Sequence, residues 1–401
     1  MKHIIILGDG MADLPEASLG NKTLLQYAHT PNMDRLAKMG RCGVLITVPQ
    51  GFTPGSEVAN LSILGYDVPK VYEGRGPLEA AALHIDLHPE EMAIRCNLIT
   101  IDGDTIKSHS AGQISTDEAT ELIDFIDRQI DNENIKFHAG SQYRHLLVIK
   151  GGSKLIECTP PHDHLREPFR PLMAKAADSS AEETANLINN LVIKSQELLK
   201  NHPINIKRLK EGRLPANSIW PWSQGYIPQM KPLNHIYPQI KEGSIISASY
   251  LINGIGTYAG LKRIYVEGAT GFYDTNYCNK AKAAINALKT DDFVYLHIDA
   301  ADEAGHEGNI EMKLRTIEDM DRYVVGPIYE AVKDRPVAIS ILPDHPTPCR
   351  LRTHTAEPVP FLIYHPGITE DNVLTFNEIS CKEGSYGVLK ENEFMNEFMK
   401  A

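Results

Sequence analysis

The chain has 401 residues, of which 42% are hydrophobic and 23% are charged, and its formal net charge at pH 7 is −12. The composition is that of an ordinary globular protein. It lacks the basic footprint of a nucleic-acid-binding protein, and no apolar run approaches the ~20 residues of a membrane helix. The N-terminus lacks a signal-peptide pattern, so we expect a cytoplasmic protein. The length exceeds what one hydrophobic core usually serves, which favours two domains.

The first predicted element is a buried strand, the apolar run Ile4–Leu7, which ends in the turn Gly8–Gly10. A helix is predicted from Thr30 to Gly40, because Pro31 suits its first turn and Gly40 suits its end. A strand followed by a helix in this way is the opening expected of an α/β protein.

A further helix is predicted directly after Gly55, which would place Ser56 at a helix N-terminus. Backbone N–H groups and the helix dipole favour an anionic phosphate there. The alternative is that Ser56 is only an N-cap, a role that serine often takes. As a nucleophile Ser56 would need activation, which a divalent metal ion is able to supply.

The middle of the chain has a different pattern of predicted helices and strands. Two capping boxes, Ser115–Glu118 and Ser180–Glu183, each precede a helix with periodic apolar residues, and Leu146–Ile149 between them is predicted to be a strand. This pattern predicts an α+β domain over residues 75–235. It would be inserted into a larger domain formed by residues 1–74 and 236–401.

The C-terminal part alternates between strand-like and helical runs, which indicates a parallel sheet covered by helices. The fold class predicted is therefore α/β. The alternating segments are the strands Ser244–Ser249, Lys262–Val266 and Phe293–Ile298, the helices Tyr250–Gly260 and Asn279–Leu288, and the later strand Val337–Leu342.

Acidic and histidine side chains follow three of these strands. The carboxyl ends of parallel strands share one edge of a sheet, where ligands bind, so residues far apart in the chain would converge there. Asp and neutral His are good ligands for divalent metals, and the cluster indicates a site for two ions. The residues are Asp9, Asp302, His306, Asp344 and His345, with His354 close behind.

The motifs that carry chemistry resemble those of cofactor-independent phosphoglycerate mutases of the archaeal type, which belong to the alkaline phosphatase superfamily. The resemblance covers nearly the whole chain. It rests on Gly8-Asp9-Gly10-Met11, Gly55-Ser56-Glu57-Val58, Gly65-Tyr66-Asp67, Gly74-Arg75-Gly76-Pro77-Leu78-Glu79-Ala80, Asp302–His306, Asp344-His345 and His354 with Pro358-Val359-Pro360.

The resemblance implies an alkaline-phosphatase-like catalytic domain with Ser56 as the nucleophile that becomes phosphoserine, and it implies two divalent ions. One ion would be held by Asp302, His306 and His354, and the other by Asp9, Ser56, Asp344 and His345. Mixed carboxylate and imidazole ligands suit manganese or zinc better than calcium. The family commonly uses manganese, with zinc or magnesium as alternatives, and it needs no 2,3-bisphosphoglycerate.

The resemblance also implies residues for the substrate. Lys280 is the candidate for a lysine that neutralises the transferring group, and an exposed helix lysine is the alternative. The inserted domain would act as a lid whose arginines hold the carboxylate of a small phosphorylated or hydroxylated acid. The candidates are Arg75, Arg95, Arg144 and Arg208. The oligomeric state stays open.

Two departures from the archaeal pattern leave the substrate open. The chain has Gln113 where the family usually has arginine, and Val58-Ala59-Asn60 where it usually has Thr-Ala-His. These departures resemble a bacterial branch proposed to phosphorylate homoserine. Interconversion of 2- and 3-phosphoglycerate is therefore the expected activity, and a homoserine kinase that makes O-phosphohomoserine on the same site is the alternative.

Overall fold

A computed structural model describes all residues from 1 to 401. The chain divides into two compact units, the first formed by residues 1–72 and 229–401 and the second by residues 73–228. None of the helices combines the length and the apolar character that a membrane crossing requires.

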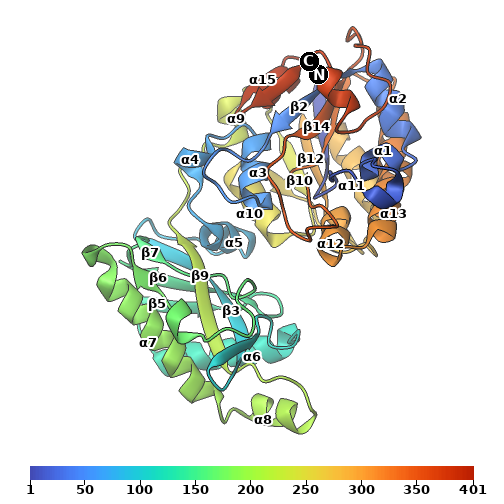
Figure 1. Cartoon of the computed structure of the whole chain (residues 1–401). Helices are drawn as coiled ribbons and strands as arrows, with labels where there is room; N and C mark the ends of the chain where they lie inside the picture. Colours follow the sequence, from blue (N-terminus) through green and yellow to red (C-terminus); the bar gives the residue numbers. More distant parts are fainter. The chain divides into compact units, whose positions relative to one another are not determined.

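The first unit is built on an eight-stranded sheet with the order β11-β10-β12-β1-β13-β14-β2-β15 (Figure 1). The strands from β11 to β13 are parallel, as the sequence predicted, but β14 runs antiparallel to both of its neighbours. The strands are β1 (Lys2–Gly8), β2 (Arg41–Ile46), β10 (Gly243–Ile246), β11 (Lys262–Arg263), β12 (Phe293–Ile298), β13 (Val337–Leu342), β14 (Val359–Tyr364) and β15 (Gly387–Lys390).

Helices cover both faces of this sheet, which confirms the predicted α/β class (Figure 1). One face carries α2 (Pro31–Met39), α11 (Tyr277–Thr290), α13 (Ile310–Met320) and α14 (Gly326–Val332), and the other carries α3 (Ser56–Ile63) and α10 (Tyr250–Tyr258). The shorter elements are α1 (Leu24–Tyr27), α4 (Val68–Val71), α9 (Leu233–Ile236), α12 (Ala300–Glu307), the π-helix Asp321–Val325 and α15 (Glu393–Phe398).

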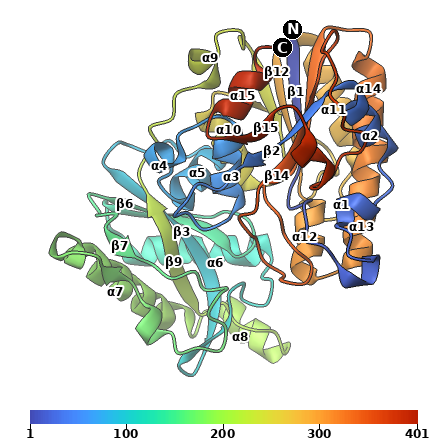
Figure 2. The same cartoon turned by 45° about the horizontal axis from the view of Figure 1, so that its top comes forward.

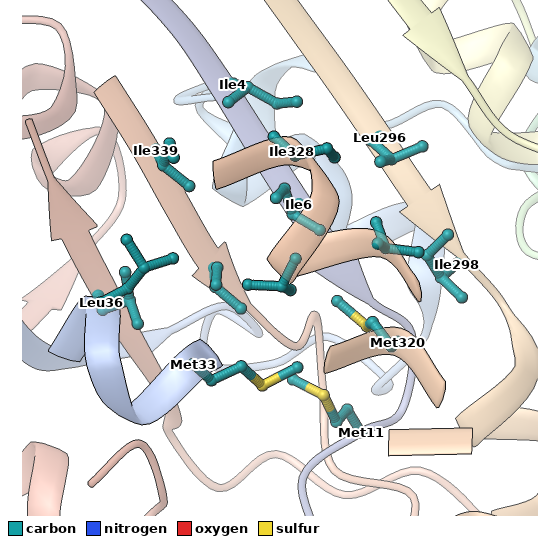
Figure 3. Close-up of a cluster of buried hydrophobic side chains, with 14 of the residues drawn as sticks. Ile4, Ile6, Met11, Met33, Leu36, Leu296, Ile298, Met320, Ile328 and Ile339 are labelled. Atoms are coloured by element: carbon teal, nitrogen blue, oxygen red, sulfur yellow. The ribbon is translucent and has the colours of Figure 1, made fainter. Parts of the chain in front are cut away.

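The hydrophobic core on the α11 side is formed by alternate residues of the central strands. Ile4 and Ile6 of β1 lie beside Leu296 of β12 and Ile339 of β13, and they pack against Ile328 of α14 (Figure 3). Because side chains alternate along a strand, the residues between them point to the opposite face. This alternation sends two polar residues of β12, Tyr295 and His297, toward the face that carries α3.

The second unit has an antiparallel sheet in which β3 pairs with β4, β6 and β9, and β5 pairs with β6. Figure 2 shows α6 and α7 beside these strands. The elements are α5 (Arg75–Ala82), β3 (Glu91–Asp102), β4 (Thr105–Ser108), α6 (Thr116–Ile130), β5 (Ile135–His138), β6 (Arg144–Lys150), β7 (Ile156–Glu157), β8 (Lys175–Ala176), α7 (Glu182–Leu199), α8 (Pro203–Lys210) and β9 (Ser218–Gly225).

Of the two predicted capping boxes, the first forms only its N-cap bond and the second does not form. Ser115 caps α6 by accepting a hydrogen bond from the backbone N–H of Glu118. The N-cap of α7, in contrast, is Ala181, which makes no side-chain bond, and Ser180 lies in a 3₁₀ turn that Asp178 caps. Asp178 Oδ1 accepts from both the backbone N–H and the hydroxyl of Ser180, so the turn starts earlier than the Ser-x-x-Glu pattern predicts.

Candidate metal centre and nucleophile

The acidic and histidine residues singled out in the sequence lie at one edge of the sheet of the first unit. Asp9 follows β1, Asp344 and His345 follow β13, and α12, which carries Asp302 and His306, follows β12. The three strands are parallel neighbours in matched register, so their carboxyl ends meet.

Two imidazoles and one carboxylate form the outer part of this cluster. Asp302 Oδ2 lies 3.2 Å from Nε2 of His306, and Asp302 Oδ1 lies 3.3 Å from Nε2 of His354. The two Nε2 atoms are 2.9 Å apart. On the far side of each ring, Nδ1 lies 3.1 Å from Arg352 O for His306 and 3.4 Å from Pro54 O for His354.

A carbonyl oxygen only accepts, so each Nδ1 carries the ring proton and each Nε2 of a neutral ring presents a lone pair to the other. Two lone pairs facing each other beside a carboxylate need a cation between them. Burial lowers the pKa of His306, but the hydrogen bond and charge of Asp302 outweigh it and raise the pKa to about 9. In the metal-free protein a proton therefore lies between Nε2 of His306 and Nε2 of His354. A divalent ion bound by these nitrogens would displace that proton.

His345 connects this outer part to the nucleophile. Thr347 Oγ1 donates to Asp302 Oδ1 at 2.5 Å and lies 3.2 Å from His345 Nδ1, so it accepts from that nitrogen. Nε2 of the fully buried His345 ring is then unprotonated, and it lies 3.2 Å from Ser56 Oγ. Burial lowers the pKa of His345, which keeps the ring neutral.

The inner part of the cluster holds two more carboxylates. Nε2 of His345 is 3.6 Å from Asp9 Oδ1 and 3.4 Å from Asp344 Oδ2. Burial, followed by the charges of Asp344 and Asp302, raises the pKa of Asp9 well above its usual value. Asp9 Oδ1 is buried without a hydrogen-bond partner. Carboxylates crowded in this way, with one oxygen unpaired, fit a bound cation.

The ligand atoms form two groups that are suited to divalent metal ions, and within each group all atoms lie within 4.8 Å of one another. One group is Asp302, His345 and His354, and the other is Asp9, His297 and Asp344. The structure thus brings together all seven residues predicted as ligands, but it groups His345 with Asp302 and adds His297. Sequence reasoning missed His297, whose signal was a histidine in an otherwise apolar strand.

Ser56 is the first residue of α3, and the N-cap is Gly55, so the interpretation of Ser56 as an N-cap is wrong. Its Oγ therefore remains available for chemistry. The N-terminal end of this eight-residue helix faces the ligand cluster through Ser56 and His345. The N-terminus of a helix favours an anionic oxygen, because its backbone N–H groups and its dipole point toward it.

Lys280 is fully buried in α11, so its interpretation as an exposed helix lysine is wrong. Its amine lies 3.3 Å from the carbonyl oxygen of His297 and 3.4 Å from Asp299 Oδ2. Asp299 Oδ2 is in turn 3.5 Å from His297 Nδ1, and His297 Nε2 is 3.2 Å from Asp9 Oδ2. Lys280 therefore approaches the metal centre through these two residues.

The second unit gathers a cationic and aromatic cluster around Trp222. The guanidinium carbons of Arg95 and Arg75 lie 4.8 and 5.5 Å from centroids of Trp222 rings, and Arg144 stacks on Tyr143 at 4.3 Å. The Arg95 guanidinium is also paired with Glu79 at 2.7 Å. Three of the four predicted substrate arginines are therefore in this one cluster, together with their aromatic supports.

Two histidines of this cluster were not predicted. The ring of His162 lies 5.3 Å from Trp222 and 6.2 Å from His109. Burial lowers the pKa of both imidazoles, and the neighbouring arginines lower it further, to about 4 for His162. Both rings are neutral at pH 7 and offer one donor and one acceptor each. Gln113 is exposed, with a left-handed φ of 55°.

The fourth predicted substrate arginine, Arg208, is not part of this cluster, and its side chain is bonded within α6, α8 and their loops. The side chain is 1% exposed, and it donates to Leu214 O at 2.8 Å, Ala111 O at 2.6 Å and Glu118 Oε2 at 2.5 Å. These partners take one bond from each of its three nitrogens within the second unit. The sequence offered only an arginine on a polar helix, and burial against α6 is a tertiary property.

We expect Arg208→Met to destabilise the second unit by about 3 kcal/mol, because it leaves the carbonyl oxygens of Ala111 and Leu214 without this donor and Glu118 with Arg213 as its remaining arginine partner. Both tryptophans of the chain, Trp220 and Trp222, lie in this unit, so urea unfolding followed by fluorescence reports on it. Arg213→Met is the matched control, because Arg213 pairs with the same Glu118 at the surface. Equal stability of the two variants would contradict the structural role.

Removal of divalent metal should destabilise the first unit, because the crowded carboxyl groups of Asp9, Asp302 and Asp344 then lose the cation that compensates them. By linkage, a free ion at about 100 times its Kd stabilises the folded state by about 2.7 kcal/mol. Calorimetry with a chelator, and then with Mn²⁺ restored, measures the shift of the melting temperature. An unchanged melting temperature at saturating metal would argue against an ion at these residues.

The parallel sheet and the cluster of imidazoles and carboxylates at its edge define the class of protein: an α/β enzyme with a candidate centre for divalent metal ions at the carboxyl ends of its strands. The family model described as 2,3-bisphosphoglycerate-independent phosphoglycerate mutase matches residues 37–205. A protein of that name from Methanosarcina mazei is 49% identical, with both chains covered completely. The chain therefore belongs to the family of 2,3-bisphosphoglycerate-independent phosphoglycerate mutases, which are isomerases.

Solved structures agree with this membership. The PH0037 protein of Pyrococcus horikoshii has a TM-score of 0.85 at 31% identity, with 100% of this chain and 96% of that chain covered. A cofactor-independent phosphoglycerate mutase of Thermoplasma acidophilum has a TM-score of 0.68 at 29% identity, with 100% and 99% covered. The relatives do not favour the alternative of homoserine phosphorylation.

Proposed function

We propose that this protein interconverts 2-phosphoglycerate and 3-phosphoglycerate through a phosphoserine at Ser56, with two divalent ions, manganese foremost. The observation that carries the proposal is the position of Ser56 Oγ. It lies at the start of α3, 3.2 Å from an unprotonated imidazole nitrogen, beside a cluster of three carboxylates. The choice of phosphoglycerate as the substrate follows from the name of the relatives, 2,3-bisphosphoglycerate-independent phosphoglycerate mutase.

The bound ions would neutralise the phosphoryl oxygens and stabilise the Ser56 alkoxide. Asp302, His306 and His354 would hold one ion, and Asp9, Asp344, His345 and Ser56 the other, with His297 beside Asp9. The Ser56 oxygen attacks phosphorus, and the bond from phosphorus to the glycerate oxygen breaks. The alternative glycerate hydroxyl then attacks the phosphoserine, which frees Ser56. The site must exclude water in between, since hydrolysis would make the protein a phosphatase.

The second unit, as an inserted domain, would supply the groups that hold the substrate carboxylate. Arg144 and Arg75 offer charged donors beside the neutral rings of His109 and His162, and Trp222 and Tyr143 fix the planes of the guanidinium groups. A planar guanidinium matches a carboxylate with two parallel hydrogen bonds. The positive charge of Lys280 would influence the metal centre indirectly, because Lys280 contacts Asp299, Asp299 contacts His297, and His297 contacts Asp9.

Phosphorus NMR tests the function directly. Metal-loaded protein is incubated with 3-phosphoglycerate alone and, separately, with homoserine and ATP. We expect 2-phosphoglycerate in the first tube without released phosphate. Release of phosphate alone would indicate a phosphatase. O-phosphohomoserine in the second tube, with no isomer in the first, would overturn the mutase proposal.

Arg144→Ala should raise KM for phosphoglycerate roughly 10-fold or more, because a charge-assisted hydrogen bond to the carboxylate is lost. The metal affinity should stay unchanged, since Arg144 lies in the other unit. Steady-state kinetics measures the effect. Arg213→Ala, which removes a surface arginine away from Trp222, should leave KM as it is, and a similar rise in both variants would contradict the assignment.

A further inference from the structure

A buried network behind the metal centre is centred on Asn60 of α3. The side chain is fully buried. Its Nδ2 donates to Asp344 Oδ2 at 3.0 Å and to the backbone oxygen of Ser56 at 2.8 Å, and its Oδ1 accepts from the Tyr295 hydroxyl at 2.5 Å. The two acceptors on the Nδ2 side fix the orientation of the amide, because a carbonyl and a carboxylate cannot donate.

We propose that Asn60 is a positioning residue that locks the metal ligand Asp344 and the turn carrying Ser56 into one arrangement. The inference rests on the proposed function, because it requires a metal ion at Asp344 and a nucleophile at Ser56. It assigns a role to a residue that touches neither the ion nor the substrate.

The orientation of Asp344 depends on three donors. Its Oδ1 accepts from the backbone N–H groups of Gly10 at 3.0 Å and His345 at 2.9 Å, and its Oδ2 accepts from Asn60. Asn60 is therefore the side-chain donor to the oxygen that lies 3.4 Å from His345 Nε2, where the ion would bind. Groups that orient a metal ligand in this way commonly set the affinity for the metal.

The position of Ser56 depends on the same side chain. Ser56 opens α3, and the first turn of a helix frays readily. Asn60 lies four residues after Ser56, and the bond from its Nδ2 to the Ser56 carbonyl oxygen stabilises this first turn. The nucleophile and the metal ligand are thus attached to one rigid amide, and Tyr295 of β12 anchors that amide to the sheet.

The second unit contains a matched asparagine that lacks these partners. Asn205 is 1% exposed, and its amide also makes two donor bonds, to Leu199 O at 3.0 Å and Ala216 O at 2.8 Å. Its oxygen accepts from the backbone of Ala216 at 2.8 Å. Asn205 therefore represents a buried asparagine with a purely structural role.

The test is a titration of chelator-treated full-length protein with Mn²⁺, with free Mn²⁺ measured by electron paramagnetic resonance. We expect Asn60→Leu to weaken the affinity of one ion roughly 10- to 100-fold. Asn205→Leu should lower the melting temperature without changing either affinity. Tyr295→Phe should weaken the same ion about 3- to 10-fold, and it should add nothing in the Asn60→Leu background.

Wild-type affinity for both ions in Asn60→Leu, with a lowered melting temperature, would overturn the positioning role and leave the proposed function intact. If Asn60→Leu does not fold, Tyr295→Phe decides alone, and unchanged affinity in that variant overturns the inference. If the wild-type protein itself takes up no metal, the proposed function fails and the inference fails with it.

Discussion

Ser56→Ala should lower the rate of phosphoryl transfer by about 10⁴- to 10⁶-fold, because it removes the oxygen to which the phosphoryl group is transferred. The fold should persist. Ser56 is not the N-cap of α3, and its hydroxyl contacts only His345 within hydrogen-bond distance. The variant should also fail to incorporate phosphate after incubation with labelled phosphoglycerate. Phosphorus NMR and intact-protein mass spectrometry measure the two effects.

Ser62→Ala is the matched control, because it makes the same chemical change in the same helix. Ser62 is buried, and its hydroxyl has no hydrogen-bond partner. The control should therefore keep both the activity and the phosphoserine. Substantial transfer by folded Ser56→Ala would rule out the phosphoserine route and direct attention to another acceptor.

The sequence predicted that the candidate metal ligands would lie together because their placement follows from a local rule. Apolar runs of strand length end in polar turns at Asp9 and Asp344, and parallel strands bring such turns to one edge. His306 follows from helical spacing, four residues after Asp302. The antiparallel strand β14 was not predicted, because strand direction at the far end of the sheet depends on chain connections that carry no local pattern.

The residues that support the site could not be found in this way. Thr347, Asn60 and Tyr295 are ordinary polar residues in sequence. Their roles come from tertiary contacts, because Thr347 bonds the ligand Asp302 and Asn60 joins Asp344 to Tyr295. Arg208 shows the reverse error, because a basic residue on a polar helix turned out to be buried. A single sequence indicates which residues have reactive side chains. It indicates much less well which other side chains each of them contacts in the folded protein.

Lys313→Met should destabilise the first unit by about 3–5 kcal/mol, the usual effect of leaving one partner of a buried ion pair without the other. Lys313 of α13 and the Asp13 carboxylate are both completely buried, 2.8 Å apart. The amine also donates to Ala12 O at 3.1 Å and to Thr347 O at 2.8 Å. It thus joins the segment after Asp9 to the segment after His345, so the variant should also bind Mn²⁺ more weakly.

Two comparisons separate this effect from a general loss of charge. Lys333→Met removes an exposed pair with Glu330 and should leave the melting temperature nearly unchanged. The double variant Lys313→Met with Asp13→Asn should recover part of the stability, since the uncompensated charge is gone and the amide oxygen still accepts from one of the two backbone N–H groups, of Leu14 or of Cys349, that bond the carboxylate. Denaturant unfolding of all three variants gives the free energies. A double variant less stable than Lys313→Met would show that the cost arises from the lost carbonyl bonds rather than from the buried charge, and the two ligand segments would then be joined mainly through their backbones.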